Sequence, residues 1–307
     1  MSRRPEVTVV GSFNMDLLAR TPRMPVKGET ILGGPFYMGP GGKGANQAVA
    51  AARLGAEVRM VVKLGKDSFG DQAEANLVKE GVVPDWFIRS DESHTGVALI
   101  LVDESGENEI VVAAGVNELL RPEDVDRARR AITDADMLLV ELEVPMETVE
   151  HSIQVAHEAG TKVLLNPAPG QPLNKRMLSM VDVLTPNETE TQIITGMPVT
   201  NLDEAKAAAH KLLAEGVKSV VITLGAQGAL VVTSALTQHV PGRQVKVVDT
   251  TGAGDAFSGA LAVALAEGQE LVQAVAFSCA AAALQVTRLG TAPAMPQRAE
   301  VDAFLAG

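Results

Sequence analysis

Short apolar runs rich in β-branched residues alternate with longer helix-forming stretches along this chain. Runs that are apolar throughout, such as Val7–Val10 and Val58–Val62, are typical of strands covered by helices on both faces of a sheet. We expect strands at Val7–Val10, Val58–Val62, Met137–Glu141, Lys162–Leu165, Val181–Leu184, Ser219–Thr223 and Val245–Val248. The alternation predicts an α/β fold with a mostly parallel central sheet flanked by helices on both faces.

The helix-forming stretches carry recognisable start and stop residues. Residues Leu202–Glu215 follow Asn201, a preferred capping residue, and precede Gly216. Glu204 lies three residues after Asn201, which is the spacing of a capping box. The other expected helices are Ala45–Leu54, Asp71–Glu80, Asp255–Glu267 and Glu270–Gln285.

Two stretches depart from the strand–helix alternation. Asp16–Met38 is rich in glycine and proline and has no helical period, and Val97–Val112 has the pattern of a β-hairpin. They indicate a small β-sheet lid built from about residues 14–40 and 95–113, on a chain that otherwise forms one domain over 1–307. The alternative is that they add two edge strands to the one sheet.

Composition excludes several classes of function. The chain has 26 basic and 38 acidic residues, a formal charge of −12, which argues against binding nucleic acid or an acidic membrane. Its one cysteine, Cys279, excludes an intramolecular disulfide and a cysteine-rich zinc site. It has neither the roughly 18-residue apolar run of a membrane span nor a secretory signal, so a cytoplasmic location is expected.

The segment DTTGAGD, Asp249 to Asp255, precedes an alanine-rich helix. Gly252, Ala253 and Gly254 are small, so their N–H groups at a helix start could approach and bind an anion closely. Asp255 beside such an anion hole could accept the proton of an attacking hydroxyl, as transfer of a charged group requires. The alternative is that Asp255 is only a helix cap and the glycines only form a turn.

A second glycine-rich segment, GPGGKGANQ, spans residues 39–47. Its match to the dinucleotide motif GxGxxG lacks the context of a preceding strand and a later acidic residue, and it is not a P-loop. Lys43 and Asn46 at the start of a helix suit a polyhydroxylated ligand. The alternative is a tight turn with a solvated lysine.

Three further segments follow expected strands. GSFNMD places Asn14 and Asp16 where they could bind vicinal sugar hydroxyls, or form an ordinary polar turn. TPNETE contains Asn187 and Glu190, which fit a capping box and could also order hydrated Mg²⁺ over nucleotide phosphates. TLGAQG, residues 223–228, has the pattern of a β-turn, and Glu143 is a loop carboxylate that is uninformative by itself.

Together, the segments GSFNMD, GGKGANQA, TPNETE and DTTGAGDAFSGA resemble, in their order, the ribokinase-like carbohydrate kinase superfamily. The resemblance covers nearly the whole chain. It implies a central sheet with a small β-sheet lid, and pairing of two lids in a homodimer. It also implies ATP-dependent phosphorylation of the 5-hydroxyl of D-ribose, with Mg²⁺ accompanying ATP and activation by a monovalent cation, usually K⁺.

The resemblance also implies roles for individual residues. Sugar-binding positions are Asn14, Asp16, Gly42, Lys43, Asn46 and Glu143, with Asp255 as base and Gly252, Ala253 and Gly254 as anion hole. ATP-binding positions are Asn187, Thr223, Gly225, Gly228 and Gly254, with Glu190 near Mg²⁺. The cation positions are Asp249 and Thr251 with the backbone carbonyls of Gln285, Arg288 and Gly290. Ala294 replaces a frequent serine at the last cation position, and Cys279 replaces a residue that often contacts adenine.

Other functions remain open from sequence. Adenosine kinases and ketodeoxygluconate kinases share the fold, so the acceptor could be another sugar or a nucleoside. The chain could instead be a non-catalytic ribose-binding regulator, although Asp255 and GAGD argue against it. A nicotinamide dehydrogenase rests only on the GxGxxG match.

Overall fold

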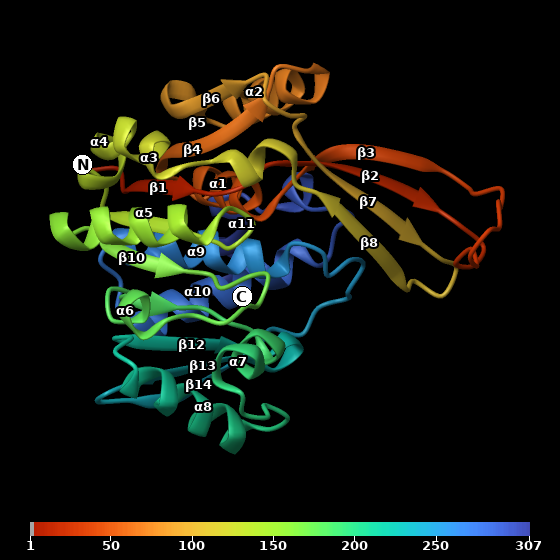
Figure 1. Cartoon of the computed structure of the whole chain (residues 1–307). Helices are drawn as coiled ribbons and strands as arrows, with labels where there is room; N and C mark the ends of the chain where they lie inside the picture. The colour runs from red at the N-terminus through yellow and green to blue at the C-terminus, as the bar shows by residue number, and fades with distance from the viewer. Residues whose placement is uncertain (1–2) are drawn as a thin grey trace.

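The computed structural model describes residues 3–307, whose strands form two separate sheets (Figure 1). The larger sheet contains β1 Glu6–Val10, β4 Glu57–Gly65, β5 Val82–Val83, β6 Phe87–Ser90, β9 Met137–Val140, β10 Lys162–Leu165, β11 Val183–Leu184, β12 Ser219–Thr223, β13 Gly228–Thr233 and β14 Thr237–Pro241. Its order is β14-β13-β12-β11-β10-β9-β1-β4-β5, with β6 paired to β4. All neighbours pair in parallel except β12 with β13 and β13 with β14. The expected mostly parallel α/β sheet is confirmed.

Helices cover both faces of this sheet (Figure 1). They are α1 Lys43–Arg53, α2 Ser68–Lys79, α3 Pro122–Arg127, α4 Arg129–Thr133, α5 Met146–Ala159, α6 Lys175–Leu178, α7 Glu188–Thr195, α8 Leu202–Ala214, α9 Ala253–Ala266, α10 Leu271–Gln285 and α11 Arg298–Ala306. Leu139 of β9 packs in the apolar core that contains α1, α9 and α10. Its neighbours Leu138 and Val140 pack in the second core, with α5 and α8. The strand therefore buries both faces, as its uniformly apolar sequence predicts.

Helices α1 and α9 approach each other closely because both are rich in small residues. A Cβ atom added at Gly259 of α9 would lie 2.7 Å from both the Ala50 Cβ and the Gln47 carbonyl oxygen. Only glycine permits this separation, since real Cβ atoms essentially never come that near. The contact holds the first turn of α9 beside the first turn of α1.

The smaller sheet has four strands: β2 Asn14–Arg20, β3 Phe36–Gly41, β7 Gly96–Val102 and β8 Asn108–Ala113, in the order β3-β2-β7-β8. It extends away from the main sheet in Figure 1. Strands β7 and β8 form the expected hairpin around residues 103–107. The alternative of two edge strands on a single sheet is wrong.

All five expected helices occur, as α1, α2, α8, α9 and α10. The Asn201 side chain accepts from the N–H groups of Asp203 and Glu204 at the start of α8, as its capping role predicts. Val181–Leu184 is shorter than expected, since only Val183 and Leu184 pair.

The expected strand at Val245–Val248 is wrong. This segment follows edge strand β14 and has no ladder partner, and Val247 and Val248 are both 56% exposed. Its β-branched residues therefore favour extended backbone without a neighbouring strand to pair with. In residues 3–307, no helix combines the length and hydropathy needed to cross a membrane.

The parallel strands end at one edge of the main sheet, where their loops meet the start of α1 and α9. Loop 11–13 follows β1 and leads into β2, Glu141 follows β9, Asn166 follows β10 and loop 185–187 follows β11. In open α/β sheets this edge is where ligands bind.

Candidate active site

Asp255 lies in the first turn of α9, where it is 6% exposed. Its carboxylate accepts from Asn46 Nδ2 at 2.9 Å and from Gln47 Nε2 at 3.0 Å, both on α1. Burial raises the pKa of Asp255, while Lys43 and these two amides oppose the rise. The residue before the helix is Gly252, so Asp255 is not the helix cap. A buried carboxylate with a raised pKa is suited to accept a proton.

The start of α1 requires glycine at two positions. Gly42 has φ +87°, and a Cβ atom there would lie 2.6 Å from Asn14 N. A Cβ atom at Gly44 would lie 2.6 Å from Ser12 N. The helix start therefore packs directly on the loop after β1, which places Lys43 and Asn46 beside the Asn14 segment.

Glu143 connects the loops at this edge. Its Oε2 accepts from Ser12 Oγ at 2.6 Å, from Lys43 N at 3.0 Å and from Asn14 Nδ2 at 3.4 Å. A residue that was uninformative in the sequence thus joins the loops after β1 and β9 with the start of α1. The structure brings Asn14, Lys43 and Glu143 together as the resemblance implied.

Asp16 lies close to the same group of carboxylates. Burial, together with charge repulsion from Glu143 and Asp255, raises the pKa of Asp16 to about 7. A Cβ atom at Gly41 would lie 2.2 Å from the Asp16 carboxylate oxygens, so the backbone of β3 approaches this side chain closely.

Lys43 is the cation at the centre of these acids. Burial by itself would lower the pKa of Lys43, but attraction to Asp255, Glu143, Glu141 and Glu190 outweighs burial and raises it. The ammonium group therefore stays charged and compensates part of the acidic cluster.

Three supporting residues carry no functional pattern in the sequence. Glu141 is fully buried and accepts from the N–H groups of Ser12 and Glu143, and burial raises its pKa. Asn117 donates to the Asn14 side-chain oxygen at 2.9 Å. Gln47 donates to Asp255 and to Asn166 Oδ1. Of the three, only Gln47 could have been suggested by the sequence, because it lies inside the GPGGKGANQ segment.

The start of α9 presents backbone N–H groups beside Asp255. Gly252 has φ +84°, which favours glycine, and a Cβ atom at Gly254 would meet open space. Within residues 3–307, the N–H groups of Gly252 and Gly254 have no acceptor, whereas Ala253 N donates to the Thr250 carbonyl at 3.2 Å. Unpaired N–H groups at the positive end of a 14-residue helix can bind an anion.

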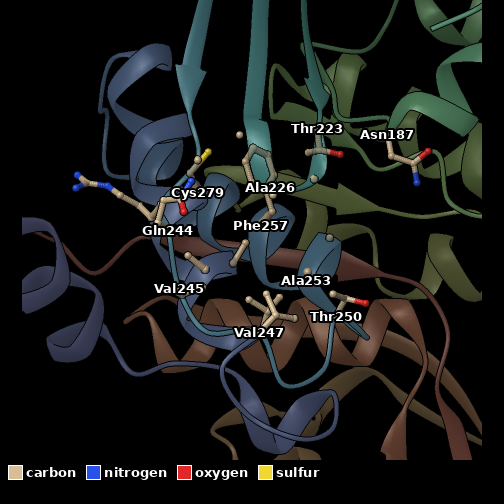
Figure 2. A pocket seen from close by; sticks show the side chains of 18 of the residues that line it. Asn187, Thr223, Ala226, Gln244, Val245, Val247, Thr250, Ala253, Phe257 and Cys279 are labelled. Carbon is tan, nitrogen blue, oxygen red and sulfur yellow. The ribbon is translucent and has the colours of Figure 1, made fainter. Parts of the chain in front are cut away.

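A cavity of about 470 Å³ lies next to this helix start. Figure 2 shows Asn187 and Thr223 on one side of it, with Gln244 and Cys279 on the other. The expected ATP positions Asn187, Thr223, Gly225, Gly228 and Gly254 all line it. Val245 and Val247, from the wrongly expected strand Val245–Val248, line it as well. Burial raises the pKa of the Cys279 thiol to about 11, so this side chain is a neutral part of the wall.

The capping box at α7 is present as the sequence predicts. Asn187 Oδ1 accepts from Glu190 N at 2.8 Å, and Glu190 Oε2 accepts from Asn187 N at 2.9 Å. Burial raises the pKa of Glu190, while Lys43 lowers it. The structural and the ligand-binding interpretations are therefore compatible, because Asn187 caps the helix and also lines the cavity.

The positions expected to bind K⁺ lie in two facing loops. Asp249 connects them, since Oδ1 accepts from Thr251 N at 2.9 Å and Oδ2 accepts from Gly290 N at 3.0 Å. The Gln285 side chain lies between the loops, where Nε2 donates to the carbonyls of Thr251 at 2.6 Å and Gly290 at 3.0 Å.

The arrangement combines a buried base, unpaired amides and a cavity at one helix start. A hydroxyl near Asp255 could lose its proton to the carboxylate while the amides stabilise charge on a transferred anionic group. Phosphoryl transfer requires this combination of positioning and charge stabilisation.

Comparison with known proteins agrees with this chemistry. A model of the pfkB family carbohydrate kinases matches residues 4–298. A ribokinase of Haemophilus influenzae is 41% identical over 302 residues, which cover 98% of this chain and 99% of that protein. A deoxyribokinase of Salmonella typhi is 39% identical over 301 residues, 98% of each chain. The structure of Arabidopsis thaliana ribokinase complexed with ribose and ATP has a TM-score of 0.92 at 32% identity, covering 99% of this chain and 100% of that one.

The raised pKa of Asp16 predicts a pH dependence of stability. Because its pKa rises from 3.8 to about 7 on folding, the native state holds the proton more tightly than the unfolded chain. The free energy of unfolding should therefore fall as pH rises from about 4 to 7. Asp16→Asn should flatten this fall in urea unfolding curves, whereas Asp85→Asn at an exposed position should not. Equal slopes for Asp16→Asn and the unaltered protein would contradict the assignment.

Proposed function

The chain belongs to the pfkB family of carbohydrate kinases, and we propose that it transfers the γ-phosphoryl group of ATP to the 5-hydroxyl of D-ribose. The observation that carries the proposal is the first turn of α9. Its buried carboxylate and unpaired amides lie between the polar cluster at Asn14, Lys43 and Glu143 and the cavity lined by Asn187 and Thr223. An acceptor and a phosphoryl donor can thus meet at one helix start.

The polar cluster supports a polyhydroxylated acceptor. Asn14, Asp16, Asn46 and Glu143 offer amide donors and carboxylate acceptors, and Lys43 adds a charged donor, with Gly42 giving the backbone its close approach. Vicinal hydroxyls both donate and accept hydrogen bonds, so they complement such a mixed set. We assign these residues to the sugar.

The proposed reaction uses the start of α9 in two ways. Asp255 takes the proton of the 5-hydroxyl as the oxygen attacks the γ-phosphorus, and the bond from phosphorus to the bridging oxygen of ADP breaks. The amides of Gly252 and Gly254 bind the phosphoryl oxygens as charge develops on them. Ala253 can join them if its N–H leaves the Thr250 carbonyl, 3.2 Å away in this structure.

The cavity supports ATP, with Asn187, Thr223, Gly225, Gly228 and Gly254 as its contacts. A Cβ atom at Gly228 would lie 2.1 Å from the Val240 carbonyl oxygen, so this floor cannot carry a larger side chain. An ATP-dependent kinase of this family uses a divalent metal with its nucleotide, and we propose Mg²⁺. Mg²⁺ is held largely by phosphates and water with one or two carboxylates, and Glu190 is suitably placed to bind it through water.

The monovalent activator fits these residues less well. Two of the carbonyls expected to bind K⁺, those of Thr251 and Gly290, already accept from the Gln285 amide. Ala294 has no side-chain oxygen to add. The proposed reaction therefore uses no monovalent cation.

We propose that the four-stranded sheet is a lid on a single catalytic domain, and that it excludes water from the acceptor site. Strands β2 and β3 carry Asn14, Asp16 and Gly41, so movement of the sheet would move acceptor-binding residues. We also propose that the enzyme works in the cytoplasm, where ATP is available; its recovery in a membrane or secreted fraction would contradict this.

The function is tested by ADP release from MgATP with a panel of acceptors: D-ribose, 2-deoxyribose, fructose, adenosine and ketodeoxygluconate. We expect kcat/KM to be highest with D-ribose, and the product to be the 5-phosphate by NMR. Preference for 2-deoxyribose would change the acceptor and keep the mechanism. Ribose binding without ADP release for any acceptor would favour a non-catalytic regulator.

Asp255→Asn tests the base. The variant keeps the shape of the side chain but cannot accept the proton, so kcat should fall by about 10²- to 10⁴-fold. Ribose affinity, measured calorimetrically without turnover, should change little. Asp302→Asn, at an exposed position on α11, is the matched control. Near-normal turnover by Asp255→Asn would refute the role of this residue.

The exposed surface of the lid supports a homodimer. Phe36, Met38, Leu99, Ile110 and Val111, on strands β3, β7 and β8, are 48–65% exposed. A second copy of the chain would remove this apolar area from water. We expect a dimer in analytical ultracentrifugation, with Val111→Lys shifting it to monomer. Leu236→Lys, in the turn between β13 and β14 at the far edge of the main sheet, should have no effect. A monomeric unaltered protein would rule out the dimer.

A further inference from the structure

We propose that the side-chain amide of Gln285 takes the place of the monovalent cation in this enzyme, so that its activity does not depend on K⁺. The inference rests on the proposed kinase function, and it concerns the two loops that meet beside the start of α9. Gln285 is the last residue of α10 and is fully buried.

Most oxygens expected to bind the cation already accept N–H groups of this chain. Gln285 Nε2 donates to the Thr251 carbonyl at 2.6 Å and to the Gly290 carbonyl at 3.0 Å. The Gln285 carbonyl itself accepts from Arg288 N at 3.1 Å. The Asp249 carboxylate accepts from the N–H groups of Thr251 and Gly290. A cation would have to displace several of these bonds.

The orientation of the Gln285 amide is fixed by the two carbonyls that it contacts. A side-chain amide nitrogen has two hydrogens, one for each of the two carbonyls it contacts. The reverse orientation would place Oε1 against two carbonyl oxygens, which repel it, so the hydrogen-bond network fixes the nitrogen there. In the described residues 3–307, Oε1 is buried without a partner. An unpaired buried acceptor opposes folding, so the two donated bonds must outweigh that cost.

The neighbouring position has lost its cation ligand. Ala294 is 1% exposed and carries no oxygen where the resemblance gives a frequent serine. The buried donor at Gln285 and the absence of a hydroxyl at Ala294 both reduce the number of oxygens available to a cation. Together they favour a neutral donor over a cation.

The bond to Thr251 acts directly on the anion hole. The Thr251 carbonyl and the Gly252 N–H belong to one planar peptide group, so fixing one fixes the orientation of the other. A donor on the carbonyl also polarises the peptide and strengthens its N–H as a donor. Gln285 is thus a positioning residue for Gly252, the role that a cation on the same carbonyl would have.

The first experiment measures ADP release with saturating D-ribose and MgATP while KCl replaces tetramethylammonium chloride at constant ionic strength. We expect the unaltered enzyme to change by less than about 2-fold, since no hydrogen bond is gained or lost. Saturable activation by K⁺ would overturn the inference. It would mean that Gln285 turns to offer Oε1 to the ion.

Two substitutions separate the effect of the amide donor from the effect of side-chain volume. Gln285→Ala removes the donor and opens space, so kcat should fall about 2- to 10-fold, the loss of one hydrogen bond, with KM for ribose unchanged. K⁺ should restore this loss. Gln285→Met fills the space without a donor, so it should lose kcat and not respond to K⁺. Gln154→Ala, at the surface of α5, is the control. Equal rescue of the Ala and Met variants would contradict the model.

A measurement without turnover keeps this inference separate from the proposed function. The Tm of the unaltered protein should be the same in KCl and tetramethylammonium chloride, because it has no site to fill. Gln285→Ala should gain a K⁺-specific rise in Tm, since a ligand that binds only the native state stabilises it. A K⁺-specific rise for the unaltered protein would refute the inference even if ribose proved not to be the acceptor. If Gln285→Ala fails to fold, the measurements on the unaltered protein and on Gln285→Met still test the inference.

Discussion

A group of carboxylates buried around one lysine is the constraint on which the catalytic edge depends. Glu143, Glu141, Asp255 and Glu190 lie near Lys43, and Asp16 lies near Glu143 and Asp255. Burial raises the pKa of Asp16, Glu141, Glu190 and Asp255. Removing carboxylates from water is costly, so each needs donors supplied by the fold. The side chains of Asn46 and Gln47 supply them to Asp255, the N–H groups of Ser12 and Glu143 to Glu141, and the N–H of Lys43 to Glu143. The loops are held together largely by these bonds.

The same constraint links the stability of the site to ligand binding. One ammonium group cannot neutralise the four carboxyl groups around it, and Asp16, Glu141, Glu190 and Asp255 bind protons more tightly than exposed acids do. Sugar hydroxyls can donate to these oxygens without bringing further negative charge. Amides at the α9 start face the opposite requirement, since they need an anion. The acidic cluster therefore favours the sugar hydroxyls, whereas the amides favour the phosphoryl group of ATP. The two sets of groups meet at the first turn of α9.

The sequence predicts the fold well wherever a local pattern determines the outcome. Continuous apolar runs identify most of the parallel strands, and Asn201 identifies the start of α8. Val245–Val248 failed because β-branched residues favour extended backbone whether or not a partner strand is present. Glu141 and Asn117 could not be found because their roles come from contacts with Ser12 and Asn14, more than 100 residues away in the chain. Contacts between such distant residues can be predicted from motifs only when a resemblance to a known family supplies the fold.

Gln285 illustrates a more specific limit of motif reading. The resemblance assigns its backbone carbonyl to the cation, and a backbone role is insensitive to side-chain identity. Any residue in the last turn of α10 would satisfy that role, so the sequence alone gives no reason to examine the glutamine. The structure places its amide against the Thr251 and Gly290 carbonyls, the first of which belongs to the same peptide group as the Gly252 N–H. A neutral amide polarises that peptide less than a full charge does. It is, however, covalently attached, so its occupancy does not depend on the ionic composition of the solution.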